Sequence, residues 1–460
     1  MHRFTRVAFG LLIVQLVSVG SEAAVFTVGI GGTYSTVQDA IDAALAAGGD
    51  NHIKMRASTF HELITIPDTM TSGSLSFTGG WSVFFTSRNP DPTSTVIHDW
   101  SDGTAATIQH VGGTVRFDGI TFTGNNPIDD AGGLFAQLFG AAELFLDHCV
   151  ITDSSTGERG GGGLIALHDT SKFEMFDCVV SNNLALNAAG TTGGGLHLYL
   201  TDSSTGKIAW SIIEGNTLQA AGSSTIKGAG VYLQILMTAQ FEIFDSIFSN
   251  NILVPTTGVE YGSEAFVTLY AGSPNVALRR NRYIADASGA GYQMLYIGAS
   301  SDATAAVSDS WFSGGDSSVI FSEIVDNSRL YLNNNTVTDF VSQSVYLAGY
   351  GDHYLISMTN NILWNDGYDH PFLSPGAITS GNLIGEDPLF VNPGEKNFRL
   401  RAGSPAIDIA TGSPAGGLSS IDLHGFERVM GPAVDAGASE WGGLFKDGFE
   451  VSTTRMWTTP

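Results

Sequence analysis

An aspartate and a histidine stand side by side at Asp147-His148, directly before a cysteine. A carboxylate and an imidazole are the side chains that most often move protons in hydrolases and lyases. The same order of side chains recurs, however, at Phe176-Asp177-Cys178 and at Phe244-Asp245-Ser246. Asp147 and His148 are therefore candidate catalytic residues, and simple membership of a repeated strand is the competing interpretation.

Arg279-Arg280-Asn281-Arg282 is the basic cluster of the chain, and Asp129-Asp130 is its pair of adjacent aspartates. An arginine base beside carboxylates that hold Ca²⁺ performs elimination on uronic acids, whereas paired carboxylates across a cleft perform glycoside hydrolysis. Arg280 is the third catalytic candidate, although alternating arginines on a strand more often form a solvated face. No metal site or cofactor is expected. Asp153 and Glu158, which lie near a glycine tract, leave Ca²⁺ as an alternative, although their spacing matches no calcium repeat.

A site for binding is indicated by three glycine tracts that end at Gly163, Gly195 and Gly230. Aligning these tracts sends the first residue after each into the core and the next one outward. The two outward rows are then Ile165, His197 and Tyr232, followed by Leu167, Tyr199 and Gln234. Rings in such rows can stack on sugars, so the predicted ligand-binding residues are His197, Tyr199 and Tyr232. A loop from Gly215 to Lys227 folded over them is the alternative.

These candidates belong to a unit that recurs along most of the chain and is clearest from Gly160 to Asn183. With Cys178 as the anchor residue, equivalent runs begin at Ile120, Cys149, Ser211, Ser246, Asn281, Ser310, Asn335 and Asn361. Repetition at a step of roughly 25–35 residues indicates a solenoid, with loops of variable length between elements that stay in register.

The repeated unit has the pattern of β-strands. Phe173-Glu174-Met175 alternates apolar and polar side chains, and glycine, asparagine, aspartate and serine lie between such runs, where turns need them. The asparagine pairs 125–126, 182–183 and 250–251 are expected to stack along the axis. The sequence therefore predicts an all-β fold, a single-stranded right-handed parallel β-helix over residues 51–385. A β-propeller is disfavoured because its blades need about 40–45 residues.

Cys149 and Cys178 are the two cysteines of the chain and lie one repeat step apart. Equivalent positions on adjacent coils are ~4.8 Å apart, which is within the Cα separation that a disulfide accepts. Stacked side chains on parallel strands point the same way, however, and cysteine also serves as a small buried apolar residue. A disulfide and a pair of free thiols both remain open.

The two ends of the chain differ from the repeats. Residues 1–23 have a basic start, a short apolar stretch and small residues at their end, which predicts a signal peptide and a secreted or cell-surface protein without a transmembrane segment. Residues 24–50 are expected to cap the solenoid. Their helix, Ser35–Ala47, has a capping box of Ser35 and Gln38 and is stopped by Gly48-Gly49.

Both ends also resemble known families. GGTYSTVQDAIDAAL, followed by IKMRASTFHELITIP, is similar to the start of pectin-lyase-like proteins, pectinesterases in particular. Residues 386–443 carry DPLF, GSPAID, DLHGFER and VDAGASEW, and this order resembles the end of bacterial choice-of-anchor Q proteins. The resemblance implies a second closing segment, which Phe398 and Leu400 would join to the last coil. Residues 444–460 resemble a DGFE-type tail of secreted bacterial proteins.

The resemblance to pectin-active proteins does not extend to their catalytic motifs. Leu146-Asp147-His148-Cys149 is similar to the WIDHC stretch of pectate lyases, but Asp129-Asp130 lacks the Gly-His-Gly and Arg-x-Lys partners of polygalacturonases. The aspartates, arginine and tryptophan of pectinesterases do not follow the cap. The formal charge of −25 argues against nucleic acid and anionic lipid as partners. We therefore expect a non-catalytic protein of adhesion or glycan binding, its partner a polysaccharide or cell-surface glycan. A polysaccharide lyase or glycoside hydrolase with an unrecognised site is the alternative.

Overall fold

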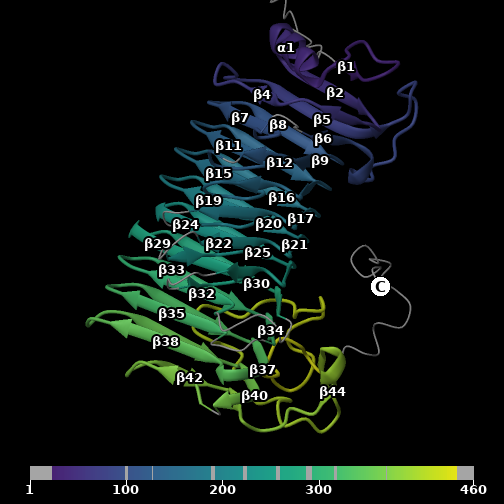
Figure 1. The fold of residues 1–460 in the computed structure, drawn as a ribbon. Coiled ribbons are helices and arrows are strands. Elements are labelled where there is room, and N and C mark those ends of the chain that lie inside the picture. The colour runs from purple at the N-terminus through teal and green to yellow at the C-terminus, as the bar shows by residue number, and fades with distance from the viewer. Residues whose placement is uncertain are drawn as a thin grey trace, which may run out of the picture.

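The computed structural model describes residues 23–98, 102–126, 128–187, 192–220, 225–254, 260–285, 293–314, 319–368 and 370–442 of the 460-residue chain. Here the chain winds through parallel strands stacked along one axis, from the N-terminal end at the top of Figure 1 to the last strands at its bottom. In the described part, no helix is long and apolar enough to cross a membrane. The predicted signal peptide and tail lie almost wholly outside these residues.

Each full coil adds one strand to each of three sheets, which we name A, B and C in the order in which the chain visits them. Within the described residues, sheet A consists of β1 (Ala24–Val28), β2 (Asp50–Arg56), β5 (Ser74–Trp81), β8 (Thr114–Asp118), β12 (Glu143–Asp147), β16 (Lys172–Phe176), β20 (Thr205–Ala209), β25 (Gln240–Phe244), β30 (Asn275–Arg279), β33 (Thr304–Ser308), β36 (Arg329–Asn333), β39 (Leu355–Thr359) and β42 (Ile378–Ser380). Sheet B consists of β3 (Thr59–His61), β6 (Val96–His98), β9 (Thr121–Thr123), β13 (Val150–Thr152), β17 (Val179–Ser181), β21 (Ile212–Glu214), β26 (Ile247–Ser249), β31 (Arg282–Ile284), β34 (Trp311–Ser313), β37 (Thr336–Gln343), β40 (Ile362–Tyr368) and β43 (Leu383–Ile384).

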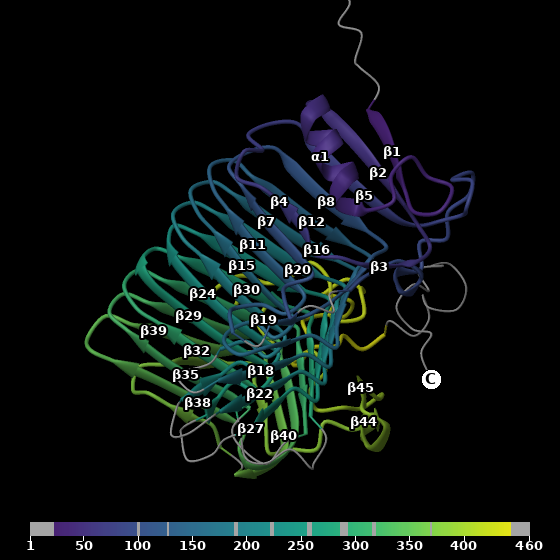
Figure 2. The same cartoon turned by 45° about the horizontal axis from the view of Figure 1, so that its top comes forward.

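Sheet C closes each coil, as the tilted view in Figure 2 shows. It consists of β4 (Ile64–Ile66), β7 (Ala106–His110), β11 (Leu134–Leu138), β15 (Gly163–Leu167), β19 (Leu196–Leu200), β24 (Val231–Met237), β29 (Ala265–Gly272), β32 (Leu295–Ala299), β35 (Ile320–Val325), β38 (Val345–Tyr350) and β41 (Phe372–Leu373). A shorter sheet D, between B and C, consists of β10 (Asn125–Asn126), β14 (Ser155–Thr156), β18 (Leu184–Asn187), β22 (Thr217–Ala220) and β27 (Ile252–Val254). The remaining elements are the parallel pair β23 (Ile226–Lys227) and β28 (Glu260–Tyr261), and the 3₁₀ turns η1 (Pro92–Ser94) and η2 (Pro393–Glu395).

The register of sheet B confirms the repeat read from the sequence. Val150 pairs with Val179, which pairs with Ile212 and so on to Ile362, so every predicted anchor residue directly precedes a strand of sheet B. The loops between sheets absorb the variable step. The predicted parallel coils are therefore confirmed, and β1, which pairs in parallel with β2, extends them into the predicted cap.

The core is a continuous column of stacked side chains inside the three sheets. Phe77 and Phe117 stack with ring centroids 4.5 Å apart, and Phe248, Tyr283 and Phe312 form a second stack at 4.9 and 4.6 Å. All five are fully buried. Burial of such a side chain stabilises the fold by about 1.5–3 kcal/mol. Because each ring is buried against rings of the adjacent coils, a single coil does not obtain this stabilisation without its neighbours.

The anchor residues form a polar ladder beside this core. From Cys178 to Asn361, each anchor side chain accepts a hydrogen bond from the backbone N–H of the anchor one coil earlier. Ser211 Oγ accepts from Cys178, and Cys178 Sγ accepts from Cys149, each at 3.2 Å. The predicted adjacency of the two cysteines is thus confirmed. Both are buried free thiols in this structure, and burial raises the pKa of the Cys178 thiol.

A second ladder consists of Asn183, Asn216 and Asn251. Asn216 Oδ1 accepts hydrogen bonds from the backbone N–H and the amide of Asn183 at 3.1 and 2.9 Å. Asn251 Oδ1 accepts the same pair from Asn216 at 3.1 and 2.9 Å. The ladder ends on the buried Glu264, which accepts from the backbone and side chain of Asn251. Burial raises the pKa of Glu264 to about 8.

The asparagine pair 125–126 does not belong to this ladder, contrary to the prediction. Asn125 is in register with Ser155, which is in register with Leu184. The ladder position of that coil is therefore Gly124, whose N–H donates to Ser154 Oγ at 3.2 Å. The pair therefore has the expected residue type, but in the register of sheet D it begins one residue after the ladder position.

The helix α1 (Val37–Ala47) lies over the first coils at the N-terminal end, as predicted (Figure 1). The predicted capping box is wrong by one residue. The N-cap is Thr36, whose hydroxyl accepts from the N–H of Asp39 at 3.1 Å, because Thr36 is the last residue with extended backbone. Gln38 donates instead to Thr65 O at 3.2 Å and thereby ties the helix to the first coil.

The closing region, which the structure describes over residues 386–442, packs on the side of the solenoid. Phe398 and Leu400 do not extend the last coil, contrary to the prediction: β45 (Asn397–Leu400) pairs antiparallel with β44 (Phe390–Asn392). The cluster buries these side chains against Trp311, Ile362 and Leu383 of sheet B. Trp311, Ile362 and Leu383 face away from the solenoid core, and the closing region covers them.

Candidate functional site

A column of side chains marks the corner where each coil passes from sheet A to sheet B. The residue before each anchor has a left-handed backbone, with φ from 49° to 70°, and the column comprises Gly119, His148, Asp177, Trp210, Asp245, Arg280, Asp309, Asn334 and Asn360. A single left-handed residue makes the sharp turn, which glycine, asparagine and aspartate tolerate best. Tryptophan and arginine are strained there, at a cost of about 1–3 kcal/mol each. Such strain points to a role for their side chains.

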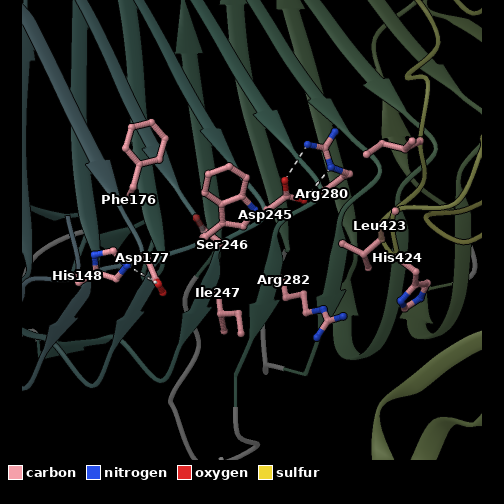
Figure 3. Close-up of a pocket in the computed structure, with 13 residues that line it drawn as sticks. His148, Phe176, Asp177, Asp245, Ser246, Ile247, Arg280, Arg282, Leu423 and His424 are labelled. Carbon is pink, nitrogen blue, oxygen red and sulfur yellow. Dashed lines mark hydrogen bonds and ion pairs between the residues drawn. The ribbon is translucent and has the colours of Figure 1, made fainter. Parts of the chain in front are cut away.

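Five residues of this corner column line a groove of about 630 Å³ (Figure 3). They are His148, Asp177, Trp210, Asp245 and Arg280. Apolar side chains from neighbouring strands, among them Phe176 and Ile247, form part of the same surface. One end of the groove is walled by four residues of the closing region, Ile421, Leu423, His424 and Gly425, and Figure 3 labels Leu423 and His424 there.

His148 lies between two carboxylates of neighbouring coils. Its Nδ1 is 3.2 Å from Asp118 Oδ1, and its Nε2 is 3.4 Å from Asp177 Oδ2. Asp118 is also paired with Arg88 at 2.8 Å. The imidazole and Asp177 are both nearly half exposed, at 46% and 45% of the side chain. This end of the groove therefore offers an accessible carboxylate held by a histidine.

Arg280 is held firmly by Asp245 from the preceding coil. Its Nε and Nη2 donate to the two carboxylate oxygens, each at 2.8 Å, and this bidentate pairing raises the pKa of the guanidinium. Both groups are less than a quarter exposed. Arg280 is thus a fixed part of the groove wall, and Asp245 has both oxygens engaged.

Trp210 lies between these two polar ends. Its ring centroid is 5.8 Å from that of Phe176, at a tilt of 35°, and 5.5 Å from that of Phe244, edge to face. The residue is 45% exposed. Because neither neighbour stacks flat on it, the indole remains available to a ligand.

The end wall is anchored by a buried arginine. Arg428, 1% exposed, pairs through Nε with Asp309 at 3.3 Å and through Nη1 with Glu440 at 3.5 Å. Burial raises the pKa of Asp309 and raises that of Glu440 to about 8, against the opposing effect of the guanidinium. A buried pair of this kind fixes position more than it stabilises. Through Arg428, the closing region thus pairs with and buries Asp309, one residue of the corner column.

The sequence matches the family described as right handed beta helix region over residues 86–283. The chain is a right-handed parallel β-helix. Similar solved structures include pectate lyase Pel9A, with 12% identity over 87% of this chain and 90% of that chain and a TM-score of 0.43. Others are pectin methylesterases from Aspergillus niger and from carrot, each 14% identical with a TM-score of 0.34, covering 61% and 63% of this chain and 86% and 84% of theirs. No curated protein matches the sequence significantly.

Of the three catalytic candidates, this β-helix brings His148 and Arg280 into one groove and leaves Asp147 outside its lining. Asp147 is the last residue of β12 and pairs with Arg116 of the preceding coil. Burial raises the pKa of Asp147, although Arg116 opposes the shift. The three residues do not converge on one point, and the repeated strand accounts for Asp147.

The predicted binding row is displaced in one coil. Leu164, and not Ile165, is in register with His197 and Tyr232. In that coil Gly162, and not the predicted Gly163, is level with Gly195 of the next coil. Ile165 points into the core and is fully buried. His197 is itself buried at 5% exposure, and burial lowers its pKa to about 3. Its Nδ1 is 2.7 Å from Thr192 Oγ1, so it is a satisfied buried histidine.

The row continues as an aromatic ladder on sheet C. Tyr232, Phe266 and Tyr296 stack almost parallel, with centroids 5.4 and 4.4 Å apart, and the stack goes on through Phe321, Tyr346 and Phe372. The faces of these rings are occupied by one another, and sugars stack on faces. Tyr199 lies in the adjacent row, beside the ring of His168. The ladder therefore stabilises the sheet and is a poor sugar platform.

Three groove residues were missed as candidates: Asp177, Trp210 and Asp245. Their signal was present, because each directly precedes an anchor, as His148 and Arg280 do. Among the described residues, no group of three or more His, Cys, Asp or Glu is placed to hold a metal ion. The alternative Ca²⁺ site at Asp153 and Glu158 thus gains no support from this part of the chain.

Proposed function

We propose that this protein binds a glycan chain in the corner groove and acts as a secreted or cell-surface β-helix without catalytic activity. The observation that carries the proposal is the exposed Trp210, held on a strained left-handed turn between two polar ends of the groove. An exposed indole presents a large apolar face with little entropy to lose. Strain at that position is most easily explained if the side chain is needed where it is.

The composition of the groove suits a sugar. A sugar ring has apolar C–H faces and hydroxyls at its rim, so it needs a flat apolar surface bordered by hydrogen-bonding groups. Trp210 and Phe176 supply the first, while Asp177, His148 and Arg280 supply the second. A pocket with a few polar groups around apolar side chains is the usual form of a ligand site.

The polar pairs favour binding over catalysis. Asp245 has both oxygens on Arg280, so neither group is free to transfer a proton. His148 and Asp177 lie two and one coils from Trp210, at ~4.8 Å per coil. Glycoside hydrolysis needs a carboxylic acid and a second carboxylate facing each other across the bond, and this row places its carboxylates along one wall.

The test is a glycan array followed by calorimetry, comparing the wild-type protein with Trp210→Ala. We expect the variant to lose roughly tenfold to a hundredfold in affinity, because it removes the stacking surface. Trp441→Ala is the matched control, since Trp441 is 41% exposed and does not line the groove. Equal affinity of Trp210→Ala and wild type would refute the proposal. Release of reducing or unsaturated ends from a bound glycan would replace it with the enzyme alternative.

A further inference from the structure

Aspartates at this corner are repeatedly occupied by the protein's own guanidinium groups. Arg88 pairs with Asp118 at 2.8 Å, and Arg280 pairs with Asp245 at 2.8 Å. Arg428 reaches in from the closing region and pairs with Asp309 at 3.3 Å. Guanidinium groups thus occupy aspartates at three places along this corner, and two of the three, Arg88 and Arg428, come from segments outside the corner column.

Asp177 is the exception among the described residues of the groove. Its ion-pair partner is His148, at 3.4 Å, and that ring is charged only when protonated. The carboxylate is 45% exposed, against 23% for Asp118 and 24% for Asp245. Asp177 therefore presents to the groove a carboxylate for which the described residues supply no arginine partner.

We propose that Asp177 and Trp210 together receive the protonated amine of an amino sugar, so that the glycan of the groove is cationic. This inference rests on the proposed function and names its ligand. The two residues occupy adjacent coils of the corner column, about 4.8 Å apart along the axis. A carboxylate gives an ammonium group a charge-assisted hydrogen bond, and an indole adds attraction between the cation and the ring face.

The charges around the groove agree with such a ligand. The chain carries a formal charge of −25, which attracts a cationic polymer over long range and repels an anionic one. Of the two arginines that line the groove, Arg280 is neutralised by Asp245. Arg282 lies at the end nearer the closing region, with its guanidinium 4.8 Å from the Trp311 ring. Neither occupies the position beside Asp177.

The experiment compares binding of a glucosamine oligomer, its N-acetylated counterpart and a glucose oligomer of equal length by calorimetry at near-neutral pH. We expect wild type to bind the glucosamine oligomer at least about tenfold more tightly than the other two. Asp177→Asn should remove that preference and keep the weaker binding of the neutral oligomers. Asparagine is well tolerated at a left-handed position, so the fold is retained. Asp68→Asn, at an exposed aspartate outside the groove, is the matched control.

The outcomes separate the two proposals. If wild type binds none of the three oligomers, the inference of an amino-sugar ligand fails, and the glycan array decides separately whether the groove binds any glycan. If it binds neutral and cationic oligomers equally, or if Asp177→Asn keeps the preference for the amine, the groove binds glycans but the amine contact is wrong. An oligolysine that binds as tightly as the glucosamine oligomer, with the same dependence on Asp177, would identify a cationic peptide as the ligand and overturn the inference.

Discussion

Replacement of Asn216 by alanine tests the ladder on which the stacking of the coils depends. The Asn216 side chain is fully buried and takes part in four hydrogen bonds. Two of these satisfy Asn183, one satisfies the carbonyl of Val180 and one reaches Asn251. In Asn216→Ala the backbone N–H of Asn183 and the carbonyl of Val180 lose these side-chain partners in a dry environment.

The expected cost follows from those orphaned groups. Each buried polar group without a partner costs about 1–3 kcal/mol, so the free energy of unfolding should fall by roughly 3–5 kcal/mol. Asn125→Ala is the control, because Asn125 has the same residue type but is exposed and outside the ladder. A surface change of that kind should stay within about 0.5–1 kcal/mol.

Urea titration gives the free energy of unfolding, and hydrogen exchange at the amide of Asn183 reports the coil directly. The second readout matters because each coil of a solenoid contacts mainly its neighbours, so the loss can appear as local opening. Equal costs for the two variants would refute the reasoning. So would unchanged protection of the Asn183 amide in Asn216→Ala.

Two further predictions concern buried titratable groups. Burial raises the pKa of Glu264 to about 8 in the fold, from about 4.5 for an exposed glutamate, so between these pH values the folded state retains a proton that the unfolded state loses. The free energy of unfolding should therefore fall as pH rises from about 4.5 to 8, by up to ~1.4 kcal/mol per pH unit from this group. Glu264→Gln should flatten that decline in urea titrations at several pH values, and an unchanged slope would count against a protonated Glu264. For the cysteines, thiol titration of the unfolded, unreduced protein should find two free thiols, as in the structure, whereas none would establish the disulfide.

The sequence predicted the repeat because its cause is local. A strand of sheet B begins directly after each anchor, and the alternation at Phe173-Glu174-Met175 places inward and outward side chains without reference to the rest of the chain. The same reasoning failed where loops differ in length. Asn125 and Gly163 each have the expected residue type, but the register shifted because the spacing from the anchor to the next sheet is not constant.

The candidate site shows the same division. The sequence by itself determined which residues precede the anchors, and it supplied His148 and Arg280 as candidates. That His148, Asp177, Trp210, Asp245 and Arg280 form one wall, with Asp177 nearly half exposed in it, was decided only by the tertiary structure. These residues are 29 to 35 positions apart in sequence, and parallel pairing brings them to successive coils. Arg88 and Arg428, which pair with Asp118 and Asp309 of the same corner, come from segments whose position depends on packing against the finished solenoid, which no local pattern encodes.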